Sequence, residues 1–245
     1  MLKSVSRAIG RQESDLVNSL RAYDDDKRPM NEDFWTYGPK TVLSALDVDI
    51  GSVSFAGTCW FHGTRTLEPD RFTRHGILAL PDIIDWLWDS ILGLVSDEID
   101  PTTWEAFRRQ IESGGGGHYA NLYRLKLAQP VDQGPLGELV RDVFLNPGAS
   151  GSHDYLGTPE IVEDIAIEAK KSLKIDIGPR FTRAAKPCLV EFQTQSYDLG
   201  ALNAALVYGM ASLAGEPIGR GACCAYSGKG KAIPACDVLS VEVVS

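Results

Sequence analysis

Hydrophobic residues recur at helical spacing in the middle of the chain. Between residues 80 and 95 an apolar stripe at i, i+3, i+4 and i+7 predicts a helix that packs on a core, formed by Ile84, Leu87, Trp88, Ile91 and Val95. Asp100 and Pro101 then offer an N-cap and a first-turn proline for a second helix. Its apolar residues are Trp104, Phe107 and Ile111, and the glycine run at 114–117 ends it.

Further helices are expected in the second half of the chain. One runs over residues 158–174, with Thr158 as its N-cap and the following proline as its first residue. Glu160 complements the positive end of its dipole. The Ala-rich segment 198–213 predicts another helix, and residues 135–144 a short one.

Alternating or continuous apolar segments predict the strands. Residues 52–60 (SVSFAGTCW) are rich in β-formers and run into His62, which we place at the end of this strand or just beyond it. Residues 118–128 (HYANLYRLKLA) alternate with the two-residue period of a half-buried strand. Later strands are expected at 188–192, 223–226 and 238–244. Because helices and strands interleave irregularly, the expected fold class is α+β.

The first 33 residues differ from the rest of the chain. Apolar residues recur there at near-helical spacing, but the segment is charged, contains few aromatics and ends in the acidic stretch at 24–33. We therefore expect an N-terminal helical arm and linker over residues 1–33, dispensable for the core fold. One domain is expected over residues 34–245.

Composition limits the classes of function. The 24 Lys and Arg residues against 33 Asp and Glu give a net charge of −9, which argues against a protein that holds nucleic acid by its phosphates. No run reaches the roughly 18 to 20 apolar residues of a membrane span, and the first residues lack a signal core. We expect no membrane contact and a cytoplasmic location, with export as an effector without a cleavable signal left open. The five cysteines form no metal pattern, so no metal site is expected.

The most specific stretch is residues 59–80, CWFHGTRTLEPDRFTRHGILAL. It places His62-Gly63-Thr64 after a predicted strand and Gly76-Ile77-Leu78 further on. This pattern resembles the first motif of the ADP-ribosyltransferase superfamily, in which a strand ends in His-Gly-Thr and a Gly-Ile or Gly-Leu step follows a short helix. The resemblance covers this stretch alone. It implies an ADP-ribosyltransferase-like α+β fold, a split β-sandwich with flanking helices, and NAD as the substrate.

The resemblance also implies roles for individual residues. His62 would bind a ribose hydroxyl of NAD, while Gly63 and Thr64 would hold the nicotinamide amide. The stretch also concentrates cations, with Arg71 between Arg65 and Arg74. A guanidinium fork matches phosphate oxygens, so Arg65 or Arg74 would face the pyrophosphate. The alternative is a solvated helix face on which these cations pair with Glu68 and Asp70.

The family needs a ring that stacks on nicotinamide and an acid that steadies the ribose. Tyr123 in the predicted strand and Tyr155 in the loop before residue 158 can supply the ring, although a tyrosine in either place can also serve packing. Glu160, beside Glu163 and Asp164, or Asp237 near the last strand can supply the carboxylate, which would stabilise the positive charge that develops on the ribose. The sequence departs from the family here, because it has no plain Glu-x-Glu or Gln-x-Glu.

The expected function is therefore an NAD-dependent ADP-ribosyltransferase or NAD glycohydrolase that cleaves the nicotinamide–ribose bond. A protein acceptor is favoured over a nucleic acid, and its identity is unknown. The main alternative is a non-catalytic ligand- or partner-binding module on the same fold. An RNA 2′-phosphotransferase-like enzyme ranks lower, because it should have a more basic cleft than this composition suggests.

Overall fold

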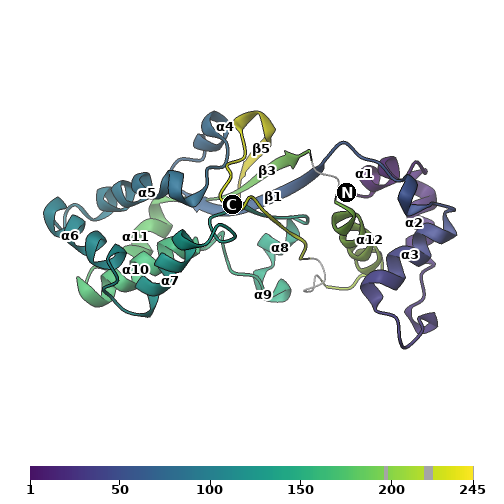
Figure 1. Cartoon of the computed structure of the whole chain (residues 1–245), viewed down its shortest axis with the longest axis horizontal. Helices are drawn as coiled ribbons and strands as arrows, with labels where there is room; N and C mark the ends of the chain where they lie inside the picture. The colour runs from purple at the N-terminus through teal and green to yellow at the C-terminus, as the bar shows by residue number, and fades with distance from the viewer. Residues whose placement is uncertain (196–197, 218–222, 245) are drawn as a thin grey trace. The chain divides into compact units, whose positions relative to one another are not determined.

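The computed structural model describes residues 1–195, 198–217 and 223–244 (Figure 1). The α-helices in these residues are α1 Leu2–Ala8, α2 Glu13–Arg21, α3 Phe34–Ala45, α4 Arg71–His75, α5 Leu80–Val95, α6 Pro101–Glu112, α7 His118–Ala128, α8 Asp142–Leu145, α9 Pro147–Ser150, α10 Glu160–Ser172, α11 Ile177–Ala184 and α12 Leu199–Leu213. The strands are β1 Thr58–Thr66, β2 Leu136–Glu138, β3 Lys186–Thr194, β4 Ala225–Ser227 and β5 Val238–Val243. The 3-10 helices in the same described ranges are η1 Asp25–Lys27, η2 Ile50–Ser52 and η4 Ala235–Asp237.

The described strands form one antiparallel sheet in the order β4-β2-β1-β3-β5. β3 and β5 pair from Cys188 opposite Val243 to Phe192 opposite Val238, with a bulge after Glu191. An antiparallel sheet combined with many helices is the α+β class expected from the sequence. The family resemblance implies two sheets, whereas the described strands make a single one.

The chain divides into two compact units, each built from three segments. The first unit comprises residues 1–60, 138–152 and 193–225, and the second comprises residues 61–137, 153–192 and 226–245. These bounds differ from the expected boundary after residue 33.

The core of the first unit is helical and includes the N-terminal helices. α1, α2, α3 and α12 contact one another, as Figure 1 shows. Leu16 and Leu20 of α2 are buried against Val42 of α3 and Leu206 of α12. The prediction of a separate arm over residues 1–33 is therefore corrected: the apolar face of these helices is part of a hydrophobic core. The scarcity of aromatic residues and the many charges in residues 1–33 did not indicate a buried face, because most residues of this core are aliphatic.

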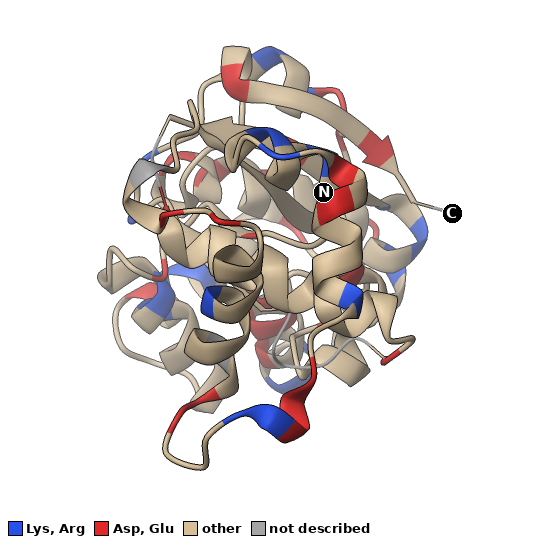
Figure 2. Ribbon diagram, turned by 90° about the vertical axis from the view of Figure 1, so that its right-hand side faces the viewer, with Lys and Arg blue, Asp and Glu red and all other residues tan. Residues whose placement is uncertain are grey.

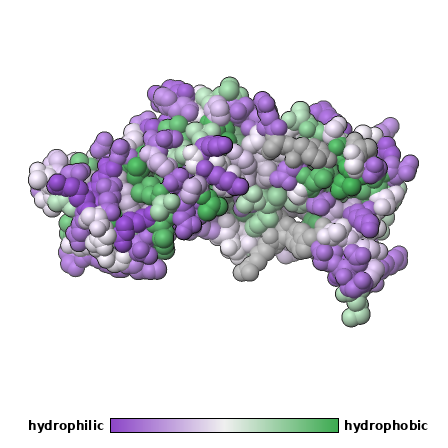
Figure 3. Space-filling view, in the orientation of Figure 1, coloured by the Kyte–Doolittle hydropathy of each residue, from purple (hydrophilic) through white to green (hydrophobic). Residues whose placement is uncertain are grey.

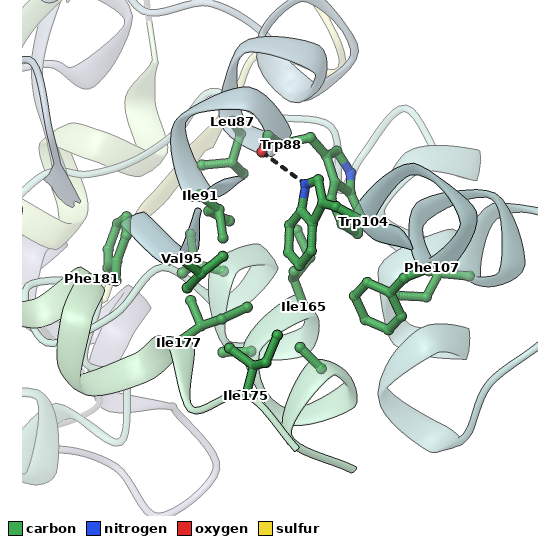
Figure 4. Close-up of a cluster of buried hydrophobic side chains, with 14 of the residues drawn as sticks. Leu87, Trp88, Ile91, Val95, Trp104, Phe107, Ile165, Ile175, Ile177 and Phe181 are labelled. Carbon is green, nitrogen blue, oxygen red and sulfur yellow. Dashed lines mark hydrogen bonds between the residues drawn. The ribbon is translucent and has the colours of Figure 1, made fainter. Parts of the chain in front are cut away.

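The second unit has a core rich in tryptophan and isoleucine (Figure 4). Trp88 of α5 packs on Trp104 of α6 with ring centroids 5.0 Å apart, and the Trp104 indole N–H donates to the Trp88 carbonyl at 3.3 Å. α10 and α11 contribute Ile165 and Ile177 from the other side of the cluster. The predicted stripe of α5 is confirmed, and so is the start of α6, where the Asp100 carboxylate accepts from the backbone of the first turn.

Residues 118–128 are a helix, α7, and not the predicted strand. The apolar residues of this segment fit the two-residue period of a strand as well as the period of a helix. Its two buried residues, Ala120 and Tyr123, lie three apart, as residues on one face of a helix do. Tertiary contacts decide between the two. α7 packs along α10, and the Glu168 carboxylate of α10 accepts a hydrogen bond from the Gly117 N–H at its start. The helix is thereby capped by a side chain that is distant in the sequence.

Three element boundaries also differ from the predictions. β1 extends to Thr66, because residues beyond the β-rich segment still pair with neighbouring strands. The predicted helix over 135–144 is instead β2 followed by α8, and Gly134 with φ of +63° and Gly137 are poor helix residues there. α10 begins at Glu160, one residue later than predicted, so Thr158 is not its N-cap. The segments predicted at 188–192, 198–213 and 238–244 are confirmed as β3, α12 and β5.

Charge and hydropathy are mixed over the molecule. In Figure 2 acidic and basic residues are scattered along the ribbons, and this view shows no single basic face. On the face in Figure 3, hydrophobic residues are interspersed with hydrophilic ones. In the described ranges no helix combines the length and the apolar composition that a bilayer crossing requires.

Candidate functional site

His62 lies inside β1 and not at its end, in the second unit. Its Nδ1 atom is 2.7 Å from the carbonyl oxygen of Leu136 in β2, and its ring meets Phe72 of α4 edge-on with centroids 6.2 Å apart. A carbonyl only accepts hydrogen bonds, so Nδ1 carries the proton and Nε2 of the neutral ring is left as an acceptor. Burial lowers the pKa of His62, opposed by the carbonyl contact, so the imidazole is neutral at neutral pH.

The short helix α4 and the glycine after it follow β1, in the order that the family resemblance implies. Gly76 has φ of +75° and ψ of −162°, and a Cβ atom here would lie 1.9 Å from the carbonyl oxygen of Ile233. Ile77 exchanges two backbone hydrogen bonds with Ile233, at 2.9 and 2.8 Å. This position therefore requires glycine for both its conformation and its close packing. The backbone of Ile77 is already paired with the segment before η4.

Gly63 and Thr64 follow His62 on β1, where Gly63 is buried and Thr64 half-buried. Their assignment to the nicotinamide amide stays a prediction.

Arg65 is bound to the protein itself. Its Nε donates to the Leu156 carbonyl at 2.8 Å, and its Nη1 donates to the carbonyls of Thr182 at 2.6 Å and Ala185 at 2.9 Å. These bonds tie β1 to the loop before α10 and to the end of α11. Three backbone oxygens thus engage three of the five N–H donors of this guanidinium, which favours a structural role for Arg65 over the expected pyrophosphate role.

Arg74 is exposed on α4 and pairs with its own neighbours. Its guanidinium lies 3.8 Å from the Glu68 carboxylate, and its Nε donates to the Asp70 carbonyl at 3.3 Å. This is the solvated helix face that the sequence left open as an alternative, and it does not favour Arg74 as the pyrophosphate ligand.

Tyr123 is a core residue of α7 with 1% of its surface exposed. Its hydroxyl accepts from the Trp88 indole N–H at 2.9 Å and donates to the Glu112 carboxylate at 3.2 Å. Burial raises its pKa to about 12. A ring packed on all sides cannot stack on a ligand, so the stacking role predicted for Tyr123 is corrected to one of packing.

Tyr155 and Glu160 lie together, in one polar cluster of the second unit. The Tyr155 hydroxyl is 3.4 Å from the Glu160 carboxylate, and its ring lies edge-on to His153 with centroids 4.8 Å apart. Lys126 of α7 reaches the Glu160 carboxylate at 3.7 Å and that of Asp164 at 2.5 Å. The sequence predicted the tyrosine and glutamate together, but it did not predict the lysine.

Asp164 is the buried member of this cluster, with 4% of its surface exposed. Burial raises the pKa of its carboxyl, and the hydrogen bond from Lys126 opposes that rise. Glu160, Asp164 and Glu168 follow at four-residue spacing on α10, and this spacing indicates one helix face. Lys126 went unnoticed because its segment was assigned to a strand.

Asp237 closes the 3-10 helix η4 and is half-buried. Both η4 and β5 pack against α4, the helix whose Phe72 contacts the His62 ring. Asp237 is thus linked to His62 only through α4. It lies directly before β5, the last strand, as expected from the sequence.

The candidate residues fall into two groups within the second unit. Side chains alternate along a strand, so His62 and Arg65 project from opposite faces of β1. The loop with Tyr155 is bound to Arg65 through Leu156, whereas α4 contacts the His62 ring through Phe72 and also packs against η4. The structure therefore brings Tyr155 and Glu160 together, and it relates Asp237 to His62 only through α4.

Within the described part of the chain, no group of three or more His, Cys, Asp or Glu side chains is arranged to hold a metal ion.

No protein-family model matches this sequence, and no match was found among the curated proteins or the solved structures.

Proposed function

We infer that this chain is an NAD-dependent ADP-ribosyltransferase or NAD glycohydrolase with an ADP-ribosyltransferase-like version of the α+β fold. The observation that carries the proposal is the state of His62: a neutral imidazole on a central strand, with Nδ1 engaged and Nε2 left as an acceptor. A ribose hydroxyl can donate to such an atom. The short helix and the strained Gly76 after β1 support the same reading of residues 59–80.

The reaction breaks the bond between C1′ of the ribose and the nicotinamide nitrogen, and nicotinamide leaves as a neutral molecule. Its electron pair stays on the ring nitrogen, and positive charge develops on the ribose. A hydroxyl of a protein acceptor, or water, then attacks C1′ and releases one proton. A carboxylate near C1′ lowers the barrier by stabilising the ribose cation and by accepting that proton.

Asp237 is the carboxylate that the packing favours for this task. It belongs to η4, which packs on α4, the helix that contacts His62 through Phe72, and its carboxylate has no other assigned role. Glu160 lies with the Arg65-anchored loop and is already close to Lys126 and Tyr155. Tyr155 is the remaining candidate for the stacking ring, and it belongs to the Glu160 group.

The direct test incubates the purified full chain with NAD and quantifies free nicotinamide by chromatography, with and without added acceptor protein. We expect release by the wild type, and at least about tenfold slower release by His62→Ala, which is roughly 1.4 kcal/mol of transition-state stabilisation. His118→Ala is the matched control, because His118 is an exposed histidine on α7. A folded His62→Ala variant with wild-type turnover would refute the role of His62.

Two isosteric variants distinguish the candidate acids. Asp237→Asn should abolish nicotinamide release, while Glu160→Gln should retain it. The reverse result would assign the acid to the Tyr155 group. If the wild type binds NAD but releases no nicotinamide, the chain is the non-catalytic binding module that the departure from the family's third motif favours.

A further inference from the structure

Arg71, the first residue of α4, has an unusual environment among the arginines of this protein. Its guanidinium carbon lies 4.5 Å from the centre of the Trp86 ring of α5. Its Nε atom is shielded from solvent and has no hydrogen-bond partner. A buried polar N–H without an acceptor costs about 1 to 3 kcal/mol. The protein thus keeps a positive charge and an unused donor beside the residue whose ring contacts His62, Phe72.

Five of the six other half-buried arginines in the described ranges have acceptors that the structure identifies. Arg65 donates to three carbonyls, Arg108 pairs with two carboxylates, and Arg180 also pairs with two. Arg28 and Arg124 are bonded within their own neighbourhoods, and Arg141 makes an interaction as well. No hydrogen bond or ion pair engages Arg71 in the same part of the chain, so its guanidinium keeps donors that the protein itself does not use.

Trp86 explains how Arg71 is held without an acceptor. A guanidinium over an indole face gains cation–π attraction, which favours a planar cation over the flexible ammonium of lysine. The ring covers a face of the guanidinium, while the N–H donors lie in its plane and point outward along its edge. Because Nε is shielded from solvent, an approaching anion meets the two terminal nitrogens, Nη1 and Nη2, whose geometry matches two phosphate oxygens.

We propose that Arg71, held against Trp86, binds the pyrophosphate of a nucleotide ligand. Arg71 thus takes the pyrophosphate-binding role that the sequence suggested for Arg65 or Arg74, both of which pair with other groups of the protein. The inference rests on the proposed function for the identity of the nucleotide, NAD. Its place before Phe72 puts the anion subsite on the same short helix that contacts His62.

The test measures binding of phosphate-bearing and phosphate-free ligands to the full chain by isothermal titration calorimetry. ADP-ribose and NAD are the phosphate-bearing probes, and nicotinamide riboside is the phosphate-free probe. Arg71→Gln should weaken binding of ADP-ribose and NAD at least about tenfold and leave nicotinamide riboside unaffected. Arg71→Lys keeps the charge but not the fork, and should fall between the two. Arg109→Gln, an exposed arginine of α6, is the control with the same change in charge.

Trp86 supplies a second arm of the experiment. Trp86→Phe keeps an aromatic face and should bind ADP-ribose nearly as the wild type, whereas Trp86→Leu should weaken it several-fold. Melting curves of all variants check that each one is folded. Equal affinity of wild type and Arg71→Gln for ADP-ribose, or no binding of ADP-ribose by the wild type, would overturn the inference.

The outcomes for the anion subsite and for the reaction are separable. If ADP-ribose binding depends on Arg71 but no nicotinamide is released, the subsite stands and the proposed activity fails. If nicotinamide is released and Arg71→Gln binds NAD as the wild type does, the activity stands and the subsite is wrong.

Discussion

The carboxylate of Glu168 accepts a hydrogen bond from the backbone N–H of Gly117 at 2.8 Å. Glu168 lies on α10 with 3% of its surface exposed, and Gly117 is the N-cap residue of α7. A negative side chain therefore faces the positive end of a helix from another part of the chain. The glycine run has a physical reason, because a Cβ atom on Gly117 would lie 3.3 Å from this carboxylate and one on Gly116 would lie 2.6 Å from Ala120.

Loss of the Glu168 carboxylate should destabilise the second unit. Glu168→Ala removes the cap of α7 and the charged acceptor of the partly buried Gly117 N–H, so we expect a loss of about 1 to 3 kcal/mol in the free energy of unfolding. Urea denaturation followed by circular dichroism measures it. Glu163→Ala on the same helix is the control, because Glu163 is half-exposed and should change stability by less than about 0.5 kcal/mol. Equal stability of both variants would contradict the capping role.

Gly76→Ala should cost more than an ordinary glycine replacement at positive φ. The substitution strains the backbone and also drives a Cβ atom into the Ile233 carbonyl. Gly10→Ala is the control, because Gly10 also has a positive φ, +65°, but no atom lies within 4 Å of an added Cβ. Its substitution therefore measures the conformational cost alone. We expect Gly10→Ala to lower the free energy of unfolding by about 1 kcal/mol and Gly76→Ala by several times as much. Similar thermal shifts for the two variants would show that the segment at Ile233 yields easily.

The N-terminal helices should be required for stability of the first unit. Leu16 is fully buried between helices, so Leu16→Ala is expected to cost about 2 to 5 kcal/mol. Removal of residues 1–33 should expose the apolar faces of α3 and α12 and reduce soluble expression. A shortened chain that melts within a few degrees of the full chain would restore the interpretation of a dispensable arm.

Tyr123→Phe should affect stability and not ligand chemistry. The change deletes the hydroxyl that joins Trp88 to Glu112 and leaves a buried indole N–H without its acceptor, for a loss of roughly 1 to 2 kcal/mol. Nicotinamide release per folded molecule should equal that of the wild type. Slower nicotinamide release at unchanged stability would indicate that Tyr123 belongs to the candidate site after all.

Protonation of His62 should lower stability in mild acid. Its folded pKa is lowered by burial, whereas the unfolded chain protonates near the ordinary value of about 6.5. Below that value unfolding takes up a proton, so the stabilisation present at neutral pH is lost as the pH falls through the folded pKa. Wild type should therefore lose more stability than His62→Asn between about pH 7 and pH 5. Parallel curves for the two proteins would mean that His62 titrates normally.

Several elements could be predicted from local signals alone. α5 and α6 each have an apolar stripe and a first-turn proline, and α6 also has a capping aspartate; each of these signals acts within a few residues. Residues 118–128 lacked such a signal, because their apolar pattern fits two periods and their helix cap is supplied by Glu168. The expected pair of Tyr155 and Glu160 was found because both belong to one short loop and helix start.

Sequence alone determined the helices and strands whose apolar periods are unambiguous, and the succession of β1, the short helix α4 and Gly76. Tertiary structure decided which arginine is left without an acceptor, since Arg65 and Arg71 are alike in the sequence and differ only in the carbonyls and the ring that reach them. It also decided that the N-terminal helices belong to a core and that Lys126 joins Glu160 and Asp164. These outcomes depend on contacts between segments that are distant in the sequence, and a local pattern of residues does not predict such contacts.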